Sequence, residues 1–124
     1  MAQLILRHDG LPLRTYPIDR DCLTVGRHSD NDIQLHDEVV SAHHARLVRR
    51  PSRYLEGHAD VFVEDRSSTN GTWVNGERVE RALLSHGDLI RMGRHEFAYE
   101  SEAEEALDRT AIYLPDNGKT SPSG

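Results

Sequence analysis

Residues 67–76 read Ser67-Ser68-Thr69-Asn70-Gly71-Thr72-Trp73-Val74-Asn75-Gly76. Two Asn-Gly pairs flank a Thr-Trp-Val run, and Asn-Gly favours tight turns because both residues accept positive φ angles. The pattern therefore predicts a very short strand held between two loops. The hydroxyls of Ser68 and Thr69 and the amide of Asn70 provide short hydrogen-bonding groups, which are suited to gripping an oxyanion or a peptide backbone.

The composition is that of one polar domain. The chain has 124 residues, of which 36% are hydrophobic, and its 15 basic and 21 acidic residues give a net charge of −6. That charge disfavours nucleic acid as a partner, because binding to phosphate backbones relies on an excess of basic residues. The single Cys22 cannot form an internal disulfide. No run of residues is apolar enough to span a membrane and the N-terminus does not resemble a signal peptide, so we expect a cytoplasmic protein with no membrane partner.

Short β-type runs continue on both sides of the opening stretch, separated by Gly, Asn and Asp. We expect strands near residues 2–8, 14–18, 22–25, 30–35, 41–50, 61–64, 72–74, 78–79, 82–84, 89–92 and 96–99. Pro17 removes a ladder donor, which places it at a sheet edge or at the end of a strand. In the run 41–50, alternation predicts Ala45, Leu47 and His43 on one face and His44 on the other. The absence of a helical period before residue 100 predicts an all-β, two-sheet antiparallel β-sandwich.

The character of the sequence changes after residue 100. Residues 102–108 are rich in Glu, Ala and Leu, which is enough for a short helical turn. Residues 116–124 have the Gly, Ser and Pro content of a disordered tail. We therefore expect a domain over residues 1–100 and a tail or linker over 101–124.

Several separate motifs occur in a fixed order along the chain. They are Gly26-Arg27, Ser41-Ala42-His43-His44, Ser68-Thr69-Asn70-Gly71-Thr72, Asn75-Gly76 and Gly87-Asp88. This order resembles the forkhead-associated (FHA) domain, with its Gly-Arg, Ser-x-x-His, Ser-Thr-Asn-Gly-Thr and Asn-Gly motifs, over about residues 2 to 100. The resemblance implies a sandwich of about eleven strands that binds phosphothreonine peptides through loops at one end and is not an enzyme.

The resemblance also implies residue roles. Arg27 and Ser41 would bind the phosphate, Thr69 would add a contact, Asn70 would hold the peptide backbone, and Ser68 would support the loop. A phosphothreonine carries roughly −1.5 to −2 charges, and one guanidinium with two hydroxyls or amides can satisfy its oxygens. Because a short peptide loses conformational freedom on docking, we expect an affinity on the order of micromolar.

Other motif positions are architectural on this resemblance. They are Gly26, His44, Gly71, Asn75 and Gly76. Ala42 falls in the peptide-binding set, but many family members have Arg or Asn there, so one side chain that could touch the ligand is absent. The implied partners are a phosphothreonine-containing protein or peptide and an upstream Ser/Thr protein kinase, with no cofactor.

Histidine and serine chemistry gives weaker alternatives. His43 and His44 are adjacent, so on a strand they face opposite ways and cannot share one metal ion, and His58, His86 and His95 lack ligand spacing. We therefore expect no metal. A Ser41–His44–Asp65 hydrolase lacks a nucleophile-elbow motif and would also place Ser41 and His44 on opposite faces of a strand.

Two alternatives remain for the function. One is a phospho-independent scaffolding or oligomerisation domain with the same fold, which Ala42 favours. The other is self-regulation, in which phosphorylated Thr110 docks into the loop site of its own or a neighbouring molecule, with Tyr113 as the third residue after it. This would give self-association through the tail.

Overall fold

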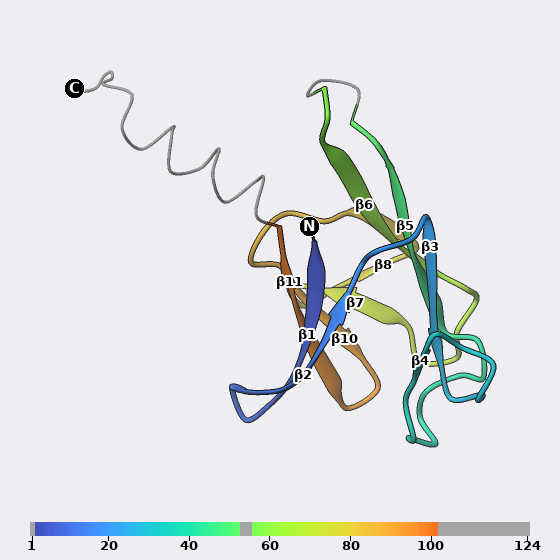
Figure 1. Ribbon diagram of the computed structural model, residues 1–124. Helices are drawn as coiled ribbons and strands as arrows, with labels where there is room; N and C mark the ends of the chain where they lie inside the picture. Colours follow the sequence, from blue (N-terminus) through green and yellow to red (C-terminus); the bar gives the residue numbers. More distant parts are fainter. Residues whose placement is uncertain (1, 53–55, 102–124) are drawn as a thin grey trace.

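Eleven strands form two facing sheets in the computed structural model, which describes residues 2–52 and 56–101 (Figure 1). The first sheet, in spatial order, consists of β2 (Leu11–Pro17), β1 (Gln3–His8), β11 (His95–Glu100), β10 (Leu89–Met92), β7 (Thr72–Val74) and β8 (Glu77–Val79). The second sheet consists of β4 (Ile33–Gln34), β3 (Cys22–Gly26), β5 (Ala45–Pro51), β6 (Ala59–Asp65) and β9 (Arg81–Leu83). The predicted all-β sandwich of about eleven strands is confirmed.

Alternate side chains of both sheets fill the space between the layers. Leu4 on β1 and Phe97 on β11 are fully buried from the first sheet, and Leu47 on β5 and Val63 on β6 from the second. Leu47 is paired in register with Val63. Burial of each such side chain stabilises the fold by about 1.5–3 kcal/mol. The packed core therefore fixes the strands from which the loops extend.

The turn predicted at Asn75-Gly76 has the expected conformation. Asn75 has φ 50° and Gly76 has φ 84°, and the pair joins β7 to β8 with Val74 opposite Glu77. Two positive φ angles in a two-residue hairpin define a type I′ turn. The short strand β7 therefore lies between two turns, as its sequence predicted.

Two strand predictions were wrong in extent. The run 30–35 forms only the two-residue strand β4, which pairs in parallel with β3. The side chain of Asp32 instead accepts hydrogen bonds from the amide and hydroxyl of Thr24, at 2.8 and 3.2 Å. Short polar side chains of this kind compete with ladder bonding, which explains why the strand is short.

The long strand expected from Ser41 begins only at Ala45. His43 is exposed and His44 is fully buried. Strand alternation had predicted the reverse, because it placed His43 on the same face as Ala45 and Leu47, which are both buried. Residues 41–44 leave the ladder and form a turn, so strand alternation does not apply to them.

The remaining segments differ in how well they were predicted. β2 is an edge strand that ends at Pro17, which agrees with the predicted position of Pro17, but it begins at Leu11, three residues earlier than expected. β5 and β6 pair as far as Pro51 opposite Ala59. The loop between them is therefore shorter than the predicted loop over residues 51–60. A pairing at residues 54–55 and the predictions for 102–124, the helical turn and Thr110 included, lie outside the described residues. No helix in the described ranges is long and apolar enough to cross a membrane.

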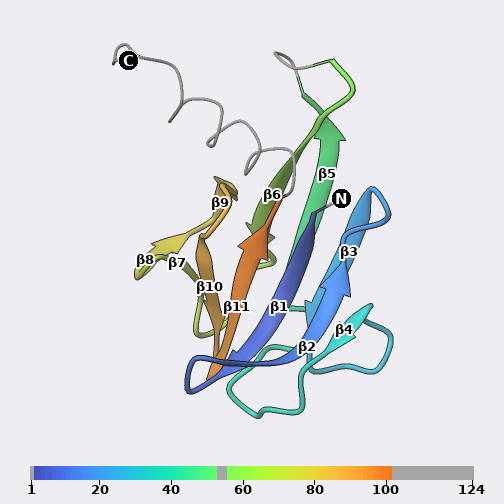
Figure 2. The same ribbon diagram turned by 60° about the vertical axis from the view of Figure 1, so that its left-hand side comes forward.

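The loops after β3, β4 and β6 are positioned by the second sheet. The β3–β4 and β4–β5 loops lie at the end of the sandwich opposite the tip of the β5–β6 hairpin (Figures 1 and 2). The β10–β11 turn reaches the same end, where the amide of Arg94 donates to Asp37 at 3.2 Å. This end therefore contains the predicted motif residues Arg27 and Ser41.

Candidate functional site

Backbone hydrogen bonds join the loop after β3 to the loop before β5. The amide of Arg27 donates to the carbonyl of Ser41 at 3.0 Å, and the amide of His28 donates to Ala42 at 3.1 Å. Asn31 adds its side-chain amide, which donates to the carbonyls of His28 and Ala42, both at 2.8 Å. These contacts fix the Arg27 backbone beside the Ser41 backbone.

Gly26 permits this approach because it lacks a side chain. A Cβ atom built there would lie 2.2 Å from the Ala42 carbonyl oxygen and 2.8 Å from the Asn31 side-chain nitrogen. Cβ atoms do not approach backbone this closely, so any larger residue would push the two loops apart. The two loops can therefore lie this close together only because residue 26 is a glycine.

His44 links the second loop to the third. Its ring accepts a hydrogen bond at Nδ1 from the Ser41 amide, at 3.1 Å, and donates from Nε2 to the Gly71 carbonyl, at 2.8 Å. One accepting and one donating nitrogen is the pattern of a neutral imidazole. The ring therefore joins the loops at Ser41 and Gly71 from a fully buried position.

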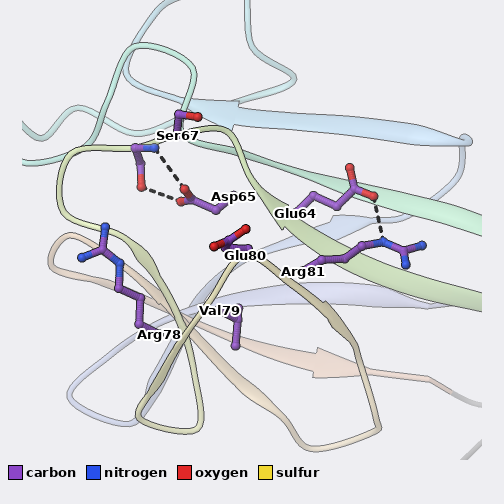
Figure 3. Close-up of a pocket in the computed structure, with 8 residues that line it drawn as sticks. Glu64, Asp65, Ser67, Arg78, Val79, Glu80 and Arg81 are labelled. Carbon is purple, nitrogen blue, oxygen red and sulfur yellow. Dashed lines mark hydrogen bonds and ion pairs between the residues drawn. The ribbon is translucent and has the colours of Figure 1, made fainter.

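The side chain of Asp65 holds the loop between β6 and β7 through hydrogen bonds. Its carboxylate accepts hydrogen bonds from the amide of Ser68 at 3.0 Å, from the hydroxyl of Ser68 and from the hydroxyl of Thr72 at 2.8 Å. Figure 3 draws the Ser68 bonds beside the labelled Asp65. Burial raises the pKa of Asp65, but these hydrogen bonds outweigh it, and the pKa is lowered. Ser68 in turn accepts from the Gly71 amide at 3.0 Å.

The three loops enclose one hollow of about 270 Å³. Its lining residues are Arg27, Glu38, Val39, Val40, Ser41, Ala42, Thr69 and Asn70. Five of the six residues predicted to bind the phosphopeptide therefore line one surface, and Ser68 lies beneath it. Of the positions predicted to be architectural, Gly26 and His44 are buried and do not line the hollow, and Gly71 has a positive φ of 89°.

Individual side chains in the hollow are held in defined positions. Arg27 donates from Nε to the Val40 carbonyl at 3.1 Å, and Asn70 donates from Nδ2 to the Val39 carbonyl at 2.8 Å. The Ser41 hydroxyl accepts from the Thr69 amide at 3.1 Å. In the described part of the chain no carboxylate forms an ion pair with Arg27. Its Nη groups therefore remain available for an anion.

A larger hollow of about 930 Å³ lies against the other side of the same loop (Figure 3). Arg78 and Arg81 are on its wall, but Glu64, Asp65 and Glu80 line it too. Glu64 accepts from Arg81 at 3.1 Å, so that arginine is already paired with a carboxylate. Arg27 and Ser41 line the smaller hollow and not this one.

Sequence reasoning missed some of these residues. Glu38, Val39 and Val40 line the hollow but belong to no recognised motif. Asp65 was considered only as a hydrolase residue, although an aspartate three residues before a serine is a common side-chain turn pattern. The hydrolase geometry was also misjudged: Ser41 and His44 are in contact, but both His44 ring nitrogens bond to backbone groups instead of the Ser41 hydroxyl.

A two-sheet all-β sandwich with an Arg, Ser and Asn hollow at one end of its strands defines a binding module of the FHA type. A family model described as "FHA domain" matches residues 23–93. The chain therefore belongs to the FHA domain family.

Two curated relatives are named as regulators. The chain is 37% identical over 97 residues to the transcriptional regulatory protein EmbR of Mycobacterium tuberculosis, which covers 77% of this chain and 23% of EmbR. It is 38% identical over 98 residues to the glycogen accumulation regulator GarA of Mycolicibacterium smegmatis, which covers 79% of this chain and 58% of GarA. The chain thus spans less than a quarter of EmbR and little more than half of GarA.

Solved structures agree with the family assignment. The Slr1951 protein from Synechocystis superposes with a TM-score of 0.71 at 30% identity, over 82% of this chain and 99% of that one. Mycobacterium tuberculosis EmbR, in complex with a low-affinity phosphopeptide, superposes with a TM-score of 0.67 at 34% identity, over 80% of this chain and 24% of that one.

Proposed function

We propose that this FHA domain binds phosphothreonine-containing segments of proteins modified by a Ser/Thr kinase, and that it does so without catalysing a reaction. The observation that carries the proposal is the hollow in which Arg27, Ser41, Thr69 and Asn70 converge from three separate loops. The solved EmbR complex with a phosphopeptide supports the same ligand class.

The phosphate would lie against Arg27 and Ser41. The Nε–Val40 hydrogen bond anchors the guanidinium, so its Nη groups can meet two phosphate oxygens as a fork. Because the Ser41 oxygen accepts from the Thr69 amide, its proton is directed elsewhere and can be donated to phosphate. The Thr69 hydroxyl adds a further donor beside it.

Asn70 would hold the peptide backbone. Its side-chain Nδ2 donates to the Val39 carbonyl at 2.8 Å, which fixes the side chain and leaves Oδ1 as an acceptor for a peptide amide. The backbone carbonyl of Asn70 accepts from the Trp73 indole at 3.2 Å, which holds the backbone at this position. The same arrangement would hold the peptide next to the phosphothreonine.

Preference for threonine over serine would come from the apolar part of the hollow. Val39, Val40 and Ala42 supply aliphatic carbon to its wall. One buried methyl group contributes about 0.8 kcal/mol, which corresponds to about a fourfold preference for phosphothreonine over phosphoserine.

A neighbouring hollow of about 540 Å³ would receive a flanking peptide residue. It shares Glu38 and Val39 with the phosphate hollow and is also lined by Leu6 and Leu13. Leu13 is 63% exposed, so it can give an incoming side chain an apolar contact. We expect an aliphatic residue at that peptide position.

A phospho-independent scaffold remains the competing function. Such a scaffold would have no need of an unpaired arginine and three hydrogen-bonding groups in one hollow. Docking of phosphorylated Thr110 into the same hollow stays a prediction, because Thr110 lies outside the described residues. A cytoplasmic location agrees with a kinase-linked role and also stays a prediction.

Fluorescence anisotropy with degenerate peptide pools tests the proposal. Phosphothreonine, phosphoserine and unphosphorylated pools are titrated with the parent, with Arg27→Ala and with Arg50→Ala, a control that removes an exposed arginine of β5. We expect binding to phosphothreonine on the order of micromolar, a loss of 10- to 100-fold in Arg27→Ala, and no change in Arg50→Ala. Equal binding of all pools, or equal loss in both variants, would refute a phosphate-specific site.

A further inference from the structure

Two histidines and an aspartate meet on the surface beside the phosphate hollow. Nδ1 of His28 lies 2.8 Å from Oδ1 of Asp30, and Nε2 of His43 lies 3.0 and 3.1 Å from the two oxygens of Asp30. One ligand-type atom from each of the three side chains lies within 4.8 Å of the other two. The prediction that no metal would bind considered His43 with His44, His58, His86 and His95, and missed His28 and Asp30, which belong to another loop.

The fold holds this cluster together before any ligand arrives. His28 and His43 lie on different loops, but the hydrogen bonds of Asn31 to the His28 and Ala42 carbonyls tie those loops together. The two imidazole rings are stacked, with centroids 5.6 Å apart and planes inclined by 26°. The cluster is therefore set by the same loop contacts that place Arg27 beside Ser41.

The chemistry of the cluster fits a divalent transition-metal ion. Zinc binds imidazole nitrogen and carboxylate oxygen at about 2.0–2.2 Å, so two ligands on a tetrahedral ion lie roughly 3.3 Å apart. The two His–Asp contacts are a few tenths of an ångström shorter than this, whereas the ligand atoms of His28 and His43 lie within 4.8 Å of each other. Binding of one ion therefore requires rotation of these exposed side chains toward a common centre.

We propose that His28, Asp30 and His43 form a binding site for one divalent transition-metal ion of the zinc class, and that the bound ion strengthens phosphopeptide binding. The three side chains are 58%, 58% and 55% exposed, so the remaining coordination positions face solvent. Water, or an oxygen of a bound partner, completes the shell there. With three exposed ligands, the expected affinity is on the order of 1–10 µM, weaker than that of closed four-ligand sites.

The link to the phosphate hollow follows from chain position. His28 directly follows Arg27, and His43 directly follows Ala42; both of these preceding residues line the hollow. An added double positive charge at this place attracts a phosphate dianion within a Debye length, an effect that salt weakens. This part rests on the proposed phosphopeptide function, whereas ion binding does not. We expect the ion to tighten peptide binding about fivefold, with the peptide tightening ion binding by the same factor.

The experiment begins without peptide. An untagged protein is titrated with Zn²⁺ against a chromophoric chelator and with Co²⁺ by visible absorption. The parent, His28→Ala, His43→Ala, Asp30→Asn and the control His58→Ala, an exposed histidine near the β5–β6 hairpin tip, are compared. We expect one ion per chain in the parent and in His58→Ala, and at least tenfold weaker binding in the other three. All three changes are at exposed side chains, and thermal melting checks that each variant is folded.

Equal ion affinity in all five proteins would show scattered binding by other histidines and would overturn the site. The second step repeats the peptide titration with and without Zn²⁺ at low and high salt. A fivefold gain in the parent that is absent in His43→Ala supports the linkage. An ion that binds at the cluster without altering peptide affinity overturns the linkage, and a peptide that never binds refutes the proposed function while leaving the ion result intact.

Discussion

Replacing Asp65 with alanine would remove the support of the loop between β6 and β7 without touching the smaller hollow itself. Asp65 accepts three hydrogen bonds, two from Ser68 and one from Thr72. Both donor residues are buried, so their hydroxyls would lose a partner that water replaces poorly. Each buried polar group left unsatisfied costs about 1–3 kcal/mol, which gives about 2–6 kcal/mol for the two hydroxyls together.

This cost is a large part of the stability of a domain of this size, which is about 5–15 kcal/mol. Urea unfolding at neutral pH should show the loss directly, and the melting temperature should fall by roughly 10–30 °C. Asp60→Ala changes an aspartate on the same strand, β6, and is the matched control. A loss below about 0.5 kcal/mol in Asp65→Ala, equal to that of the control, would refute the supporting role.

The same carboxylate gives a pH dependence of known sign. Its pKa is lowered from the ordinary value of 3.8 in the folded state, so the unfolded chain takes up the proton first as the pH falls. The stability that Asp65 contributes is therefore fully present above 3.8 and is lost as the pH falls through its lower folded value. Urea unfolding of parent and Asp65→Asn at neutral and acid pH should show their difference shrinking only in that acid window. A constant difference would contradict the assignment.

Two further substitutions test how the loops form the hollow. Gly26→Ala should lower the melting temperature strongly and weaken phosphopeptide binding, because its Cβ would lie 2.2 Å from the Ala42 carbonyl oxygen; a variant that melts and binds like the parent would contradict that close approach. Ala42→Arg should add a second guanidinium at the wall of the hollow and tighten phosphothreonine binding about tenfold, since a hydrogen bond to a charged group is worth about 1.5–3 kcal/mol. Isothermal titration at two salt concentrations measures this change, and the prediction fails if the unphosphorylated peptide gains equally.

The strand pattern was predictable because it is local. The Asn75-Gly76 turn and the hairpin over Gly93 depend on residues next to each other in the chain, and turn chemistry alone identifies them. Strand β4 was overestimated because the alternation of Ile33 and Leu35 does not reveal the hydrogen bonds from Thr24 to Asp32. That contact joins positions eight residues apart, and a period-two pattern carries no information about it.

The candidate site also has residues that the sequence predicted and contacts that it did not predict. Arg27, Ser41, Thr69 and Asn70 were named because ordered motifs identify a family, and the structure places them in one hollow. The reversal of His43 and His44 could not be predicted from strand alternation, since it depends on a turn stabilised by the distant Gly71 carbonyl; only the resemblance to the FHA family implied an architectural His44. The contact of His28 and His43 with Asp30 was not predicted for the same reason, because it depends on the pairing of two loops.

The pairing of β1 with β11 determines how the domain would respond to mechanical force. Gln3 lies opposite Glu100 in register, and their side chains share a hydrogen bond of 3.0 Å. Tension applied between these two residues would peel neighbouring strands apart one ladder bond at a time, which is the weak direction of a sheet. Tension between a ligand held at the opposite loops and Glu100 would instead run along β11 and load its hydrogen bonds together. Tension between a partner bound at those loops and Glu100 would therefore leave the sandwich closed, whereas stretching the domain between Gln3 and Glu100 would open it easily.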